Sequence, residues 1–235
     1  MCKHEHKEPI SFWLLLYPFA IVACFVLLVF RLVGLIKVRG AENFPKKKKG
    51  LLIVSPHMSF WEPAALHVLI NPIHYFFHPV AIPWSTPDKE GLYDKWFWLF
   101  FRPRSVPVSR RADNKREAVK ALNKIIELLQ MKHNVILFPE GTRKHEAKDC
   151  IKTPSGKNCI GKLKNGVGSI ICRSGCVVVI VWFERVWWSI TITIGKPTQF
   201  GVIDHPNKRV VEETTAWVGR EMLKLAESTE TREVS

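Results

Sequence analysis

The stretch DNKREAVKALNKIIELLQMKHNVILF, residues 113–138, decides the class of fold. Its first part, Asp113 to Met131, repeats apolar residues at helical spacing and predicts an amphipathic helix. These apolar residues are Ala118, Leu122, Ile125, Ile126 and Leu129. The run Val135 to Phe138 follows almost at once and is typical of a buried strand. A helix that leads directly into a buried strand indicates a β-α-β arrangement.

The same alternation of helices and strands continues on both sides of this stretch. Short apolar or alternating runs predict further strands at Leu51 to Ser55, Val177 to Phe183 and Ser189 to Ile194. Helices are expected at Trp61 to Leu69, at Gly166 to Cys172 and over about Lys208 to Ala226. We therefore predict an α/β fold, in which a central mixed or mostly parallel sheet is flanked by helices.

A long apolar run precedes this domain. Residues Ile10 to Phe30 carry no charge over 21 positions, and a helix of about 20 such residues crosses a hydrocarbon core of roughly 30 Å. Pro18 removes a backbone donor inside the run, so one kinked membrane helix and a two-helix membrane motif both stay open. A cleaved signal peptide is disfavoured, since its apolar region spans only about 7 to 15 residues. We expect residues 1–36 to form a tail and membrane anchor and residues 37–235 to form the second domain.

The charge of the chain is strongly basic. The 235 residues carry a formal net charge of +14 and are 47% hydrophobic, which excludes a disordered polyelectrolyte. A basic surface favours a phosphate-bearing partner, which is nucleic acid, an anionic membrane or a phosphorylated small molecule. Charge is balanced before the apolar run, and basic residues follow it, so the positive-inside rule places the larger domain in the cytosol. Those basic residues are Arg31, Lys37, Arg39 and Lys46 to Lys49.

Two smaller features accompany this topology. The four consecutive lysines either bind anionic headgroups or form a solvated loop, and the sequence leaves both interpretations open. The six cysteines form no CxxC pair and face the reducing side of the membrane, so we expect free thiols.

The first candidate site follows the predicted strand that ends at Ser55 and reads SPHMSFWE, residues 55–62. If Ser59 caps a helix, His57 stays in the preceding turn while the Glu62 carboxylate folds back toward the imidazole. Such a carboxylate fixes the ring tautomer, so that the other ring nitrogen takes a proton from a substrate hydroxyl. Ser59 and Glu62 also fit a capping box, in which Glu62 only binds the Ser59 amide. Both interpretations stay open.

The second candidate site follows the strand that begins at Val135. The chain there reads PEGTR, where Gly141 permits close backbone approach and Thr142 and Arg143 supply donors. A buried strand that stops at Pro139 and presents these groups is suited to receive an oxyanion. An ordinary surface turn has the same composition.

The string FPEGTR, from Phe138 to Arg143, is similar to the phosphate-site motif of the glycerolipid acyltransferases of the 1-acylglycerol-3-phosphate acyltransferase type, whose hallmark is His-x4-Asp. The resemblance covers most of residues 37–220 and keeps the family's order. It implies that 37–235 is an acyltransferase domain in which His57 is the catalytic base and Glu62, at the position of the usual Asp, orients it. The substrate-binding residues that it implies are Arg110, Glu140, Gly141, Thr142, Arg143 and Lys164.

Four departures from the family pattern bear on the identity of the acceptor. Arg104 stands where the second motif usually has Gly, and Pro107 stands where it usually has Phe. The strand Val177 to Val181 lacks the proline of the fourth motif, and the segment Lys144 to Lys162 is longer than is typical.

The resemblance implies a reaction. A fatty acyl group moves from acyl-CoA or an acyl carrier protein thioester to the free hydroxyl of lysophosphatidic acid, which gives phosphatidic acid in phospholipid biosynthesis. The expected partners are the lysophospholipid acceptor, the thioester donor and the lipid bilayer, with no nucleic acid, resident cofactor or metal. The expected location is a membrane with the domain on its cytosolic face, at the endoplasmic reticulum in a eukaryote or the inner membrane in a bacterium. Alternatives are another lysophospholipid or an acyl-amino-acid lipid as acceptor, and a non-catalytic module that binds anionic lipid.

Two further clusters fall outside these motifs. His74 and His78 have the spacing of a metal pair on a helix, but Pro72 and Pro79 flank them, and a metal site is disfavoured. An aromatic cluster lies beside Arg102 in the sequence. We expect it to pack against the sheet, and the alternatives are that it contacts lipid headgroups or lines an acyl groove. Its members are Trp96, Phe97, Trp98, Phe100 and Phe101.

Overall fold

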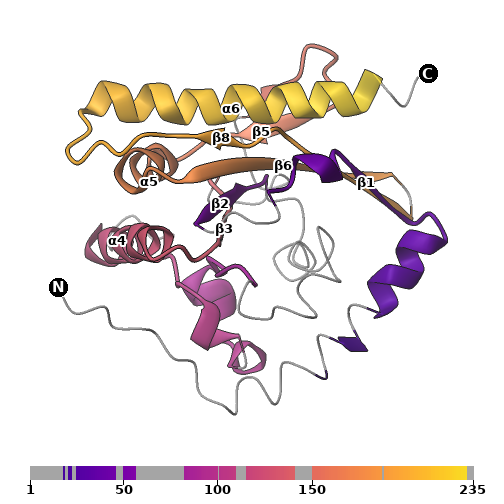
Figure 1. Ribbon diagram of the computed structural model, residues 1–235, viewed down its shortest axis with the longest axis horizontal. Helices are drawn as coiled ribbons and strands as arrows, with labels where there is room; N and C mark the ends of the chain where they lie inside the picture. Colours follow the sequence, from indigo (N-terminus) through magenta and orange to yellow (C-terminus); the bar gives the residue numbers. More distant parts are fainter. Residues whose placement is uncertain are drawn as a thin grey trace.

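A computed structural model describes residues 18, 21–22, 25–45, 50–56, 82–99, 101–109, 115–140, 150–186 and 188–231 of the chain (Figure 1). A six-stranded mixed sheet organises these residues, in the order β1-β7-β6-β2-β3 with β8 also paired to β6. Its strands are β1 (Ile36–Arg39), β2 (Leu51–Val54), β3 (Val135–Leu137), β6 (Val177–Val186), β7 (Ser189–Ile194) and β8 (Thr198–Gln199). The predicted mixed sheet with flanking helices is confirmed.

The pairing of the strands explains their composition. β2 lies between β3 and β6 and is parallel to both, and side chains pack against both of its faces. All four of its residues are buried, and they alternate between two cores. Leu52 and Val54 face the helices, whereas Leu51 and Ile53 face the opposite core. A strand that is buried on both sides has to be apolar throughout, as LLIV is.

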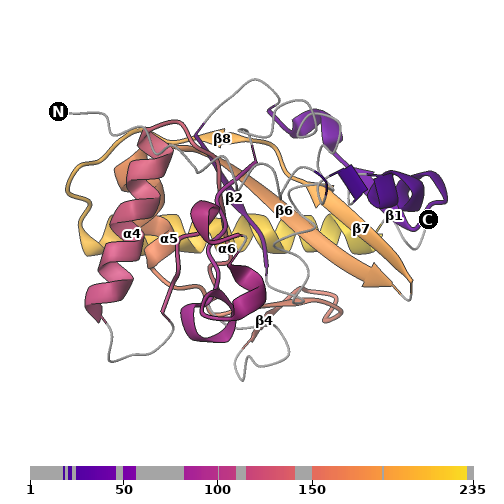
Figure 2. The same ribbon diagram turned by 90° about the horizontal axis from the view of Figure 1, so that it is seen from below.

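Three helices cover one face of the sheet: α4 (Lys115–Gln130), α5 (Gly166–Ser174) and α6 (Lys208–Thr231). Figures 1 and 2 show α6 running along β6. The second face packs Phe44 and Leu27, from before β2, against Ile53, Val179 and Ile192. α4 lies within the predicted helix Asp113 to Met131, and β3 lies within the predicted strand Val135 to Phe138.

β7 differs from its prediction. The alternation of Ile with Thr in SITITI predicts a strand with one polar, solvated face. Instead Thr191 and Thr193 are buried, and the hydroxyls of Thr193 and Thr229 on α6 form a hydrogen bond of 3.0 Å. α6 extends five residues past its predicted end and so covers this face of β7.

The strand β1 and the hairpin β4 (Cys150–Lys152) and β5 (Cys159–Gly161) were not predicted. β1 pairs with β7 and brings the end of the apolar N-terminal run to the edge of the sheet. The hairpin lies in the long segment between Lys144 and Lys162. The remaining elements are single turns: η1 (Ala41–Asn43), η3 (Lys89–Tyr93), η4 (Trp96–Trp98) and η5 (Arg102–Arg104).

Some predictions fall on residues outside the described ranges. The helix Trp61 to Leu69 and the pair His74 and His78 lie there, as does much of the apolar run Ile10 to Phe30. Residues 25–32 are helical. Among the helices that the structure describes, none combines the length and apolar character needed to cross a bilayer. The membrane anchor therefore stays a prediction.

Four described cysteines, Cys150, Cys159, Cys172 and Cys176, are free thiols. Burial raises the pKa of Cys176 to about 11, against smaller lowering effects of neighbouring hydrogen bonds. This thiol therefore stays protonated and unreactive at neutral pH.

Gly168 marks the closest approach of α5 to α6. A Cβ atom added there would lie 2.3 Å from the backbone oxygen of Val211 and 2.5 Å from Oγ1 of Thr215. We expect Gly168→Ala to lower the free energy of unfolding by about 1 to 3 kcal/mol, because a backbone oxygen cannot move aside as a side chain can. Denaturant unfolding measures this. Gly201→Ala is the matched control, since a Cβ there meets nothing within 4 Å, and an equal effect of both variants would contradict the packing argument.

Candidate active site

The two candidate motifs begin at neighbouring strand ends. Val54 at the end of β2 is paired with Leu137 at the end of β3, and the amide of Ser55 donates to the carbonyl oxygen of Leu137 at 3.2 Å. Because the two strands are parallel, both chains leave the sheet at the same edge. His57 follows Ser55 by two residues, and Glu140 follows Leu137 by three. His57 and Glu62 themselves lie outside the described residues.

The second motif leads to the same edge. The segment that begins at Trp84 pairs in parallel with Val135, and Ser85 and Asp88 pair in parallel with Ser105 and Val108. Residues 105–109 therefore run in the same direction as β3. Arg110 is the next residue in the sequence after Ser109, and it too lies outside the described residues.

Arg104, the residue that replaces the family's glycine, is buried. Its guanidinium donates to the carbonyl oxygen of Ile82, and its own carbonyl oxygen accepts from the amide of Ser85 at 3.0 Å. These contacts give Arg104 a role in holding the chain that carries the second motif. They supply the physical reason for an arginine at a position where the family usually has none.

Glu140 has a backbone partner. Its side chain is only 2% exposed, and Oε1 accepts a hydrogen bond from the amide of Gly161 on β5 at 2.8 Å. The sequence assigned Glu140 to substrate binding, and the structure places its carboxylate where it fixes the turn before Gly141. Gly141, Thr142 and Arg143 lie outside the described residues.

Lys164 joins the same turn through its backbone. Its amide donates to the carbonyl oxygen of Pro139 at 2.9 Å, and its side chain is exposed. α5 begins two residues later, so the positive end of its helix dipole lies next to this turn. Of the predicted substrate-binding residues, the structure therefore brings Glu140 and Lys164 together.

The hairpin that holds Glu140 is itself fixed by a buried carboxylate at the end of α6. Oε1 of Glu230 accepts from Asn158 Nδ2 at 2.8 Å and from Thr153 Oγ1 at 3.1 Å, and Oε2 accepts from Ser155 Oγ. Glu230 is 5% exposed. The sequence carried no signal for this contact, because the three residues that donate to Glu230 lie 72 to 77 positions before it and none belongs to a motif.

The hydrogen bonds also set the charge state of this carboxylate. Burial on its own raises the pKa of Glu230, but the bonds from Ser155, Asn158 and Thr153, with the charge of Lys157, outweigh burial and lower it. The carboxylate is therefore ionised at neutral pH and holds both ends of the hairpin loop. At its other end the hairpin supplies the Gly161 amide to Glu140.

Comparison with known proteins identifies the family of the chain. Residues 35–184 match the family model described as Acyltransferase, which is more than half of the chain, so the chain belongs to the acyltransferase family. The matched range contains His57, Glu62, Arg110, Lys164 and the turn from Glu140 to Arg143. The predicted resemblance to the glycerolipid acyltransferases is thereby confirmed.

Two known proteins are similar to the chain, one in sequence and one in structure. The chain is 25% identical over 178 residues to the chloroplastic 1-acyl-sn-glycerol-3-phosphate acyltransferase of Arabidopsis thaliana, over 75% of this chain and 42% of that protein. The chain thus spans less than half the length of that relative. It also resembles the crystal structure of the 1-acyl-sn-glycerophosphate acyltransferase PlsC from Thermotoga maritima, with 22% identity, a TM-score of 0.48 and coverage of 81% of this chain and 72% of that one.

The Glu140 contact gives a prediction that separates a structural role from direct substrate binding. Glu140→Ala leaves the Gly161 amide without its acceptor, so we expect a loss of about 1 to 3 kcal/mol in the free energy of unfolding. Amide hydrogen exchange at Gly161 should become faster. Glu213→Ala, on the exposed face of α6, is the control and should change stability by less than about 1 kcal/mol. Unchanged exchange and stability, with acceptor binding lost, would show instead that Glu140 contacts the acceptor.

The Glu230 contact predicts a pH-dependent stability. Because its pKa is lower in the folded chain, the folded state binds fewer protons than the unfolded state. The stabilisation is therefore present above the ordinary pKa of a glutamate carboxyl and is lost as the pH falls through the lowered value. We expect the difference in unfolding free energy between the natural chain and Glu230→Gln to be largest at neutral pH and to shrink in acid. Denaturant titrations at several pH values test this.

Glu221→Gln is the control for this measurement, because Glu221 forms an exposed ion pair with Lys224. Its effect should be small at every pH. A Glu230→Gln difference that does not vary with pH would contradict the assignment of the charge to Glu230.

Proposed function

We propose that the protein is a membrane-bound O-acyltransferase that transfers a fatty acyl group from an acyl thioester to the free hydroxyl of lysophosphatidic acid. The product is phosphatidic acid. The observation that carries this proposal is the family match over residues 35–184 together with the shared edge from which the His57 and Glu140 segments leave the sheet. The relative in Arabidopsis thaliana is named for this acceptor, which supports the same acceptor class here.

In the proposed mechanism His57 takes the proton of the acceptor hydroxyl, and Glu62 orients the imidazole and stabilises its charged form. The oxygen attacks the thioester carbonyl carbon, a carbon–oxygen bond forms and the carbon–sulfur bond breaks. The proton on His57 then passes to the departing thiolate, which leaves as CoA or carrier-protein thiol. No acyl-enzyme forms, and no metal or resident cofactor takes part.

The acceptor phosphate is held by Arg110, Arg143 and Lys164 in this proposal. Support comes from the exposed side chain of Lys164 and from the first turn of α5, both beside the turn that leads to Arg143. Cations and helix N-termini both attract phosphate. The overall charge of +14 suits an anionic acceptor at an anionic surface.

Attachment to the bilayer is proposed through the N-terminal apolar segment. Within residues 25–33 most apolar side chains project outward, with Phe25 66%, Leu32 77% and Val33 64% exposed, whereas Leu27 packs against the sheet. Large apolar groups in this density favour lipid contact. The basic residues that follow support a location of the acyltransferase domain on the cytosolic face, at the endoplasmic reticulum or a bacterial inner membrane.

Replacement of His57 tests the reaction. With the full chain in lipid vesicles, acyl-CoA and a panel of lysophospholipids, we expect His57→Ala to reduce thiol release by at least about 10²- to 10⁴-fold, the usual contribution of a general base. His205→Ala, in an exposed loop, is the matched control and should leave the rate unchanged. Turnover retained in His57→Ala would overturn the mechanism.

The same panel decides the acceptor and the alternative class. Turnover restricted to another lysophospholipid or to an acyl-amino-acid lipid would change the acceptor but keep the reaction. Binding of anionic lipid without thiol release from any acceptor would favour the non-catalytic module, which the glutamate at position 62 motivates.

A further inference from the structure

The aromatic cluster divides into a buried half and an exposed half. Trp98 is 8% exposed, its Nε1 donates to Ser105 Oγ at 3.2 Å, and its ring lies 5.0 Å from that of Phe101. By contrast, Trp96 is 76% exposed and Leu99 is 52% exposed on the same turn. Trp98 is therefore buried against Ser105 and Phe101, whereas Trp96 of the same cluster is exposed.

The turn that presents Trp96 and Leu99 is held on both sides. Ser105 Oγ donates to the carbonyl oxygen of Phe101 at 2.7 Å. Arg102 Nε donates to the carbonyl oxygen of Tyr93 at 3.0 Å, and the guanidinium lies 5.1 Å from the centre of the Tyr93 ring. Because these contacts fix the backbone, the exposed pair cannot turn inward without breaking them.

The surroundings of this pair favour lipid. Lys95 is exposed directly before Trp96, so a cation accompanies the two apolar groups. Tryptophan is enriched where a bilayer meets water, because its ring is apolar and its N–H is a donor. A basic residue beside it adds attraction to anionic headgroups of about 1 kcal/mol near the surface.

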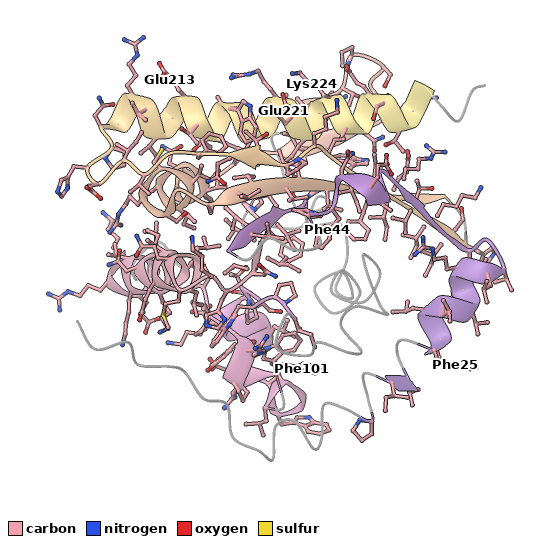
Figure 3. The ribbon with its side chains drawn as sticks, in the orientation of Figure 1. Phe25, Phe44, Phe101, Glu213, Glu221 and Lys224 are labelled. Atoms are coloured by element: carbon pink, nitrogen blue, oxygen red, sulfur yellow. The ribbon has the colours of Figure 1, made fainter. Side chains whose placement is uncertain are left out.

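The chain segment that carries the exposed pair lies away from α6. Figure 3 shows Phe101 and Phe25 on the side away from α6, with Phe25 in the exposed apolar helix of residues 25–32. On the opposite side the outer face of α6 carries ion pairs, Arg209 with Glu213 and Lys224 with Glu221. Such a charged face is suited to water.

We propose that Trp96 and Leu99 insert into the headgroup region of the bilayer and form a second membrane contact, separate from the N-terminal segment. The contact is joined to the proposed acceptor site, because Ser105 holds Trp98 and begins the parallel segment that leads to Arg110. The contact holds this segment close to the bilayer surface, where the acceptor lipid resides. This inference rests on the membrane residence proposed above.

Fluorescence quenching tests the insertion. The full chain is bound to vesicles of phosphatidylcholine and phosphatidylglycerol that carry bromine near the headgroup end of their acyl chains. The emission of Trp96 is obtained as the difference between the natural chain and Trp96→Phe. We expect brominated lipid to quench this emission and vesicles to protect it from aqueous iodide. Trp217, which is half-buried on α6 against Phe200, is the control, and its emission, obtained with Trp217→Phe, should not respond to brominated lipid.

The outcomes distinguish the two proposals. If the chain does not sediment with the vesicles, membrane residence and this inference both fail. If it sediments but Trp96 is quenched by iodide equally with and without vesicles, only this inference fails. As a second measurement, the double variant Trp96→Ser, Leu99→Ser should reduce turnover of a bilayer-embedded lysophospholipid by roughly tenfold while leaving turnover of a monomeric short-chain lysophospholipid unchanged. Equal loss on both acceptors would overturn the proposed contact.

Discussion

The parallel pairing of β2 with β3 and β6 is the constraint on which the rest of the structure depends. Parallel neighbours need long connections across the sheet. The connections that contain α4 and α5 cover one face of β2, and the chain before β2 covers the other face. The same pairing sends the chains after Val54 and Leu137 out at one edge. Two segments that are about 80 residues apart in the sequence therefore begin side by side, which is how a short base motif and a short phosphate motif come to share a site.

The sequence predicted those parts of the fold whose information is local. α4 and β3 have clear helical and strand patterns, and their positions follow from the apolar residues alone. β1 was missed, because Ile36 was assigned to the membrane anchor and Lys37 and Arg39 to its basic flank, and only the pairing with β7 makes IKVR a strand. The hairpin of β4 and β5 was missed for a related reason. Ile151 and Lys152 are exposed, so β4 shows little apolar pattern.

The candidate site follows the same division. Where the motifs leave the sheet could be predicted, because the ends of parallel strands meet at one edge. The partner of Glu140 could not, since the Gly161 amide that it accepts from belongs to a strand without a sequence signal. The buried role of Arg104 was equally out of reach, because it depends on the carbonyl oxygen of Ile82, 22 residues earlier. Motifs identify the residues near the chemistry, whereas the contacts that position them are distributed over the chain.

The carboxylate of Glu230 has a consequence for the order in which the protein assembles during its synthesis. Its hydrogen bond with Thr153 joins positions 77 residues apart, so a ribosome must release nearly the whole of α6 before the hairpin loop gains its buried acceptor. Contacts between distant positions form late in folding, since a long loop has to close first. The turn before Gly141 is thus completed by a helix made well after it. A nascent chain that stops short of position 230 carries every residue proposed for the chemistry but lacks the contact that fixes the hairpin beside them.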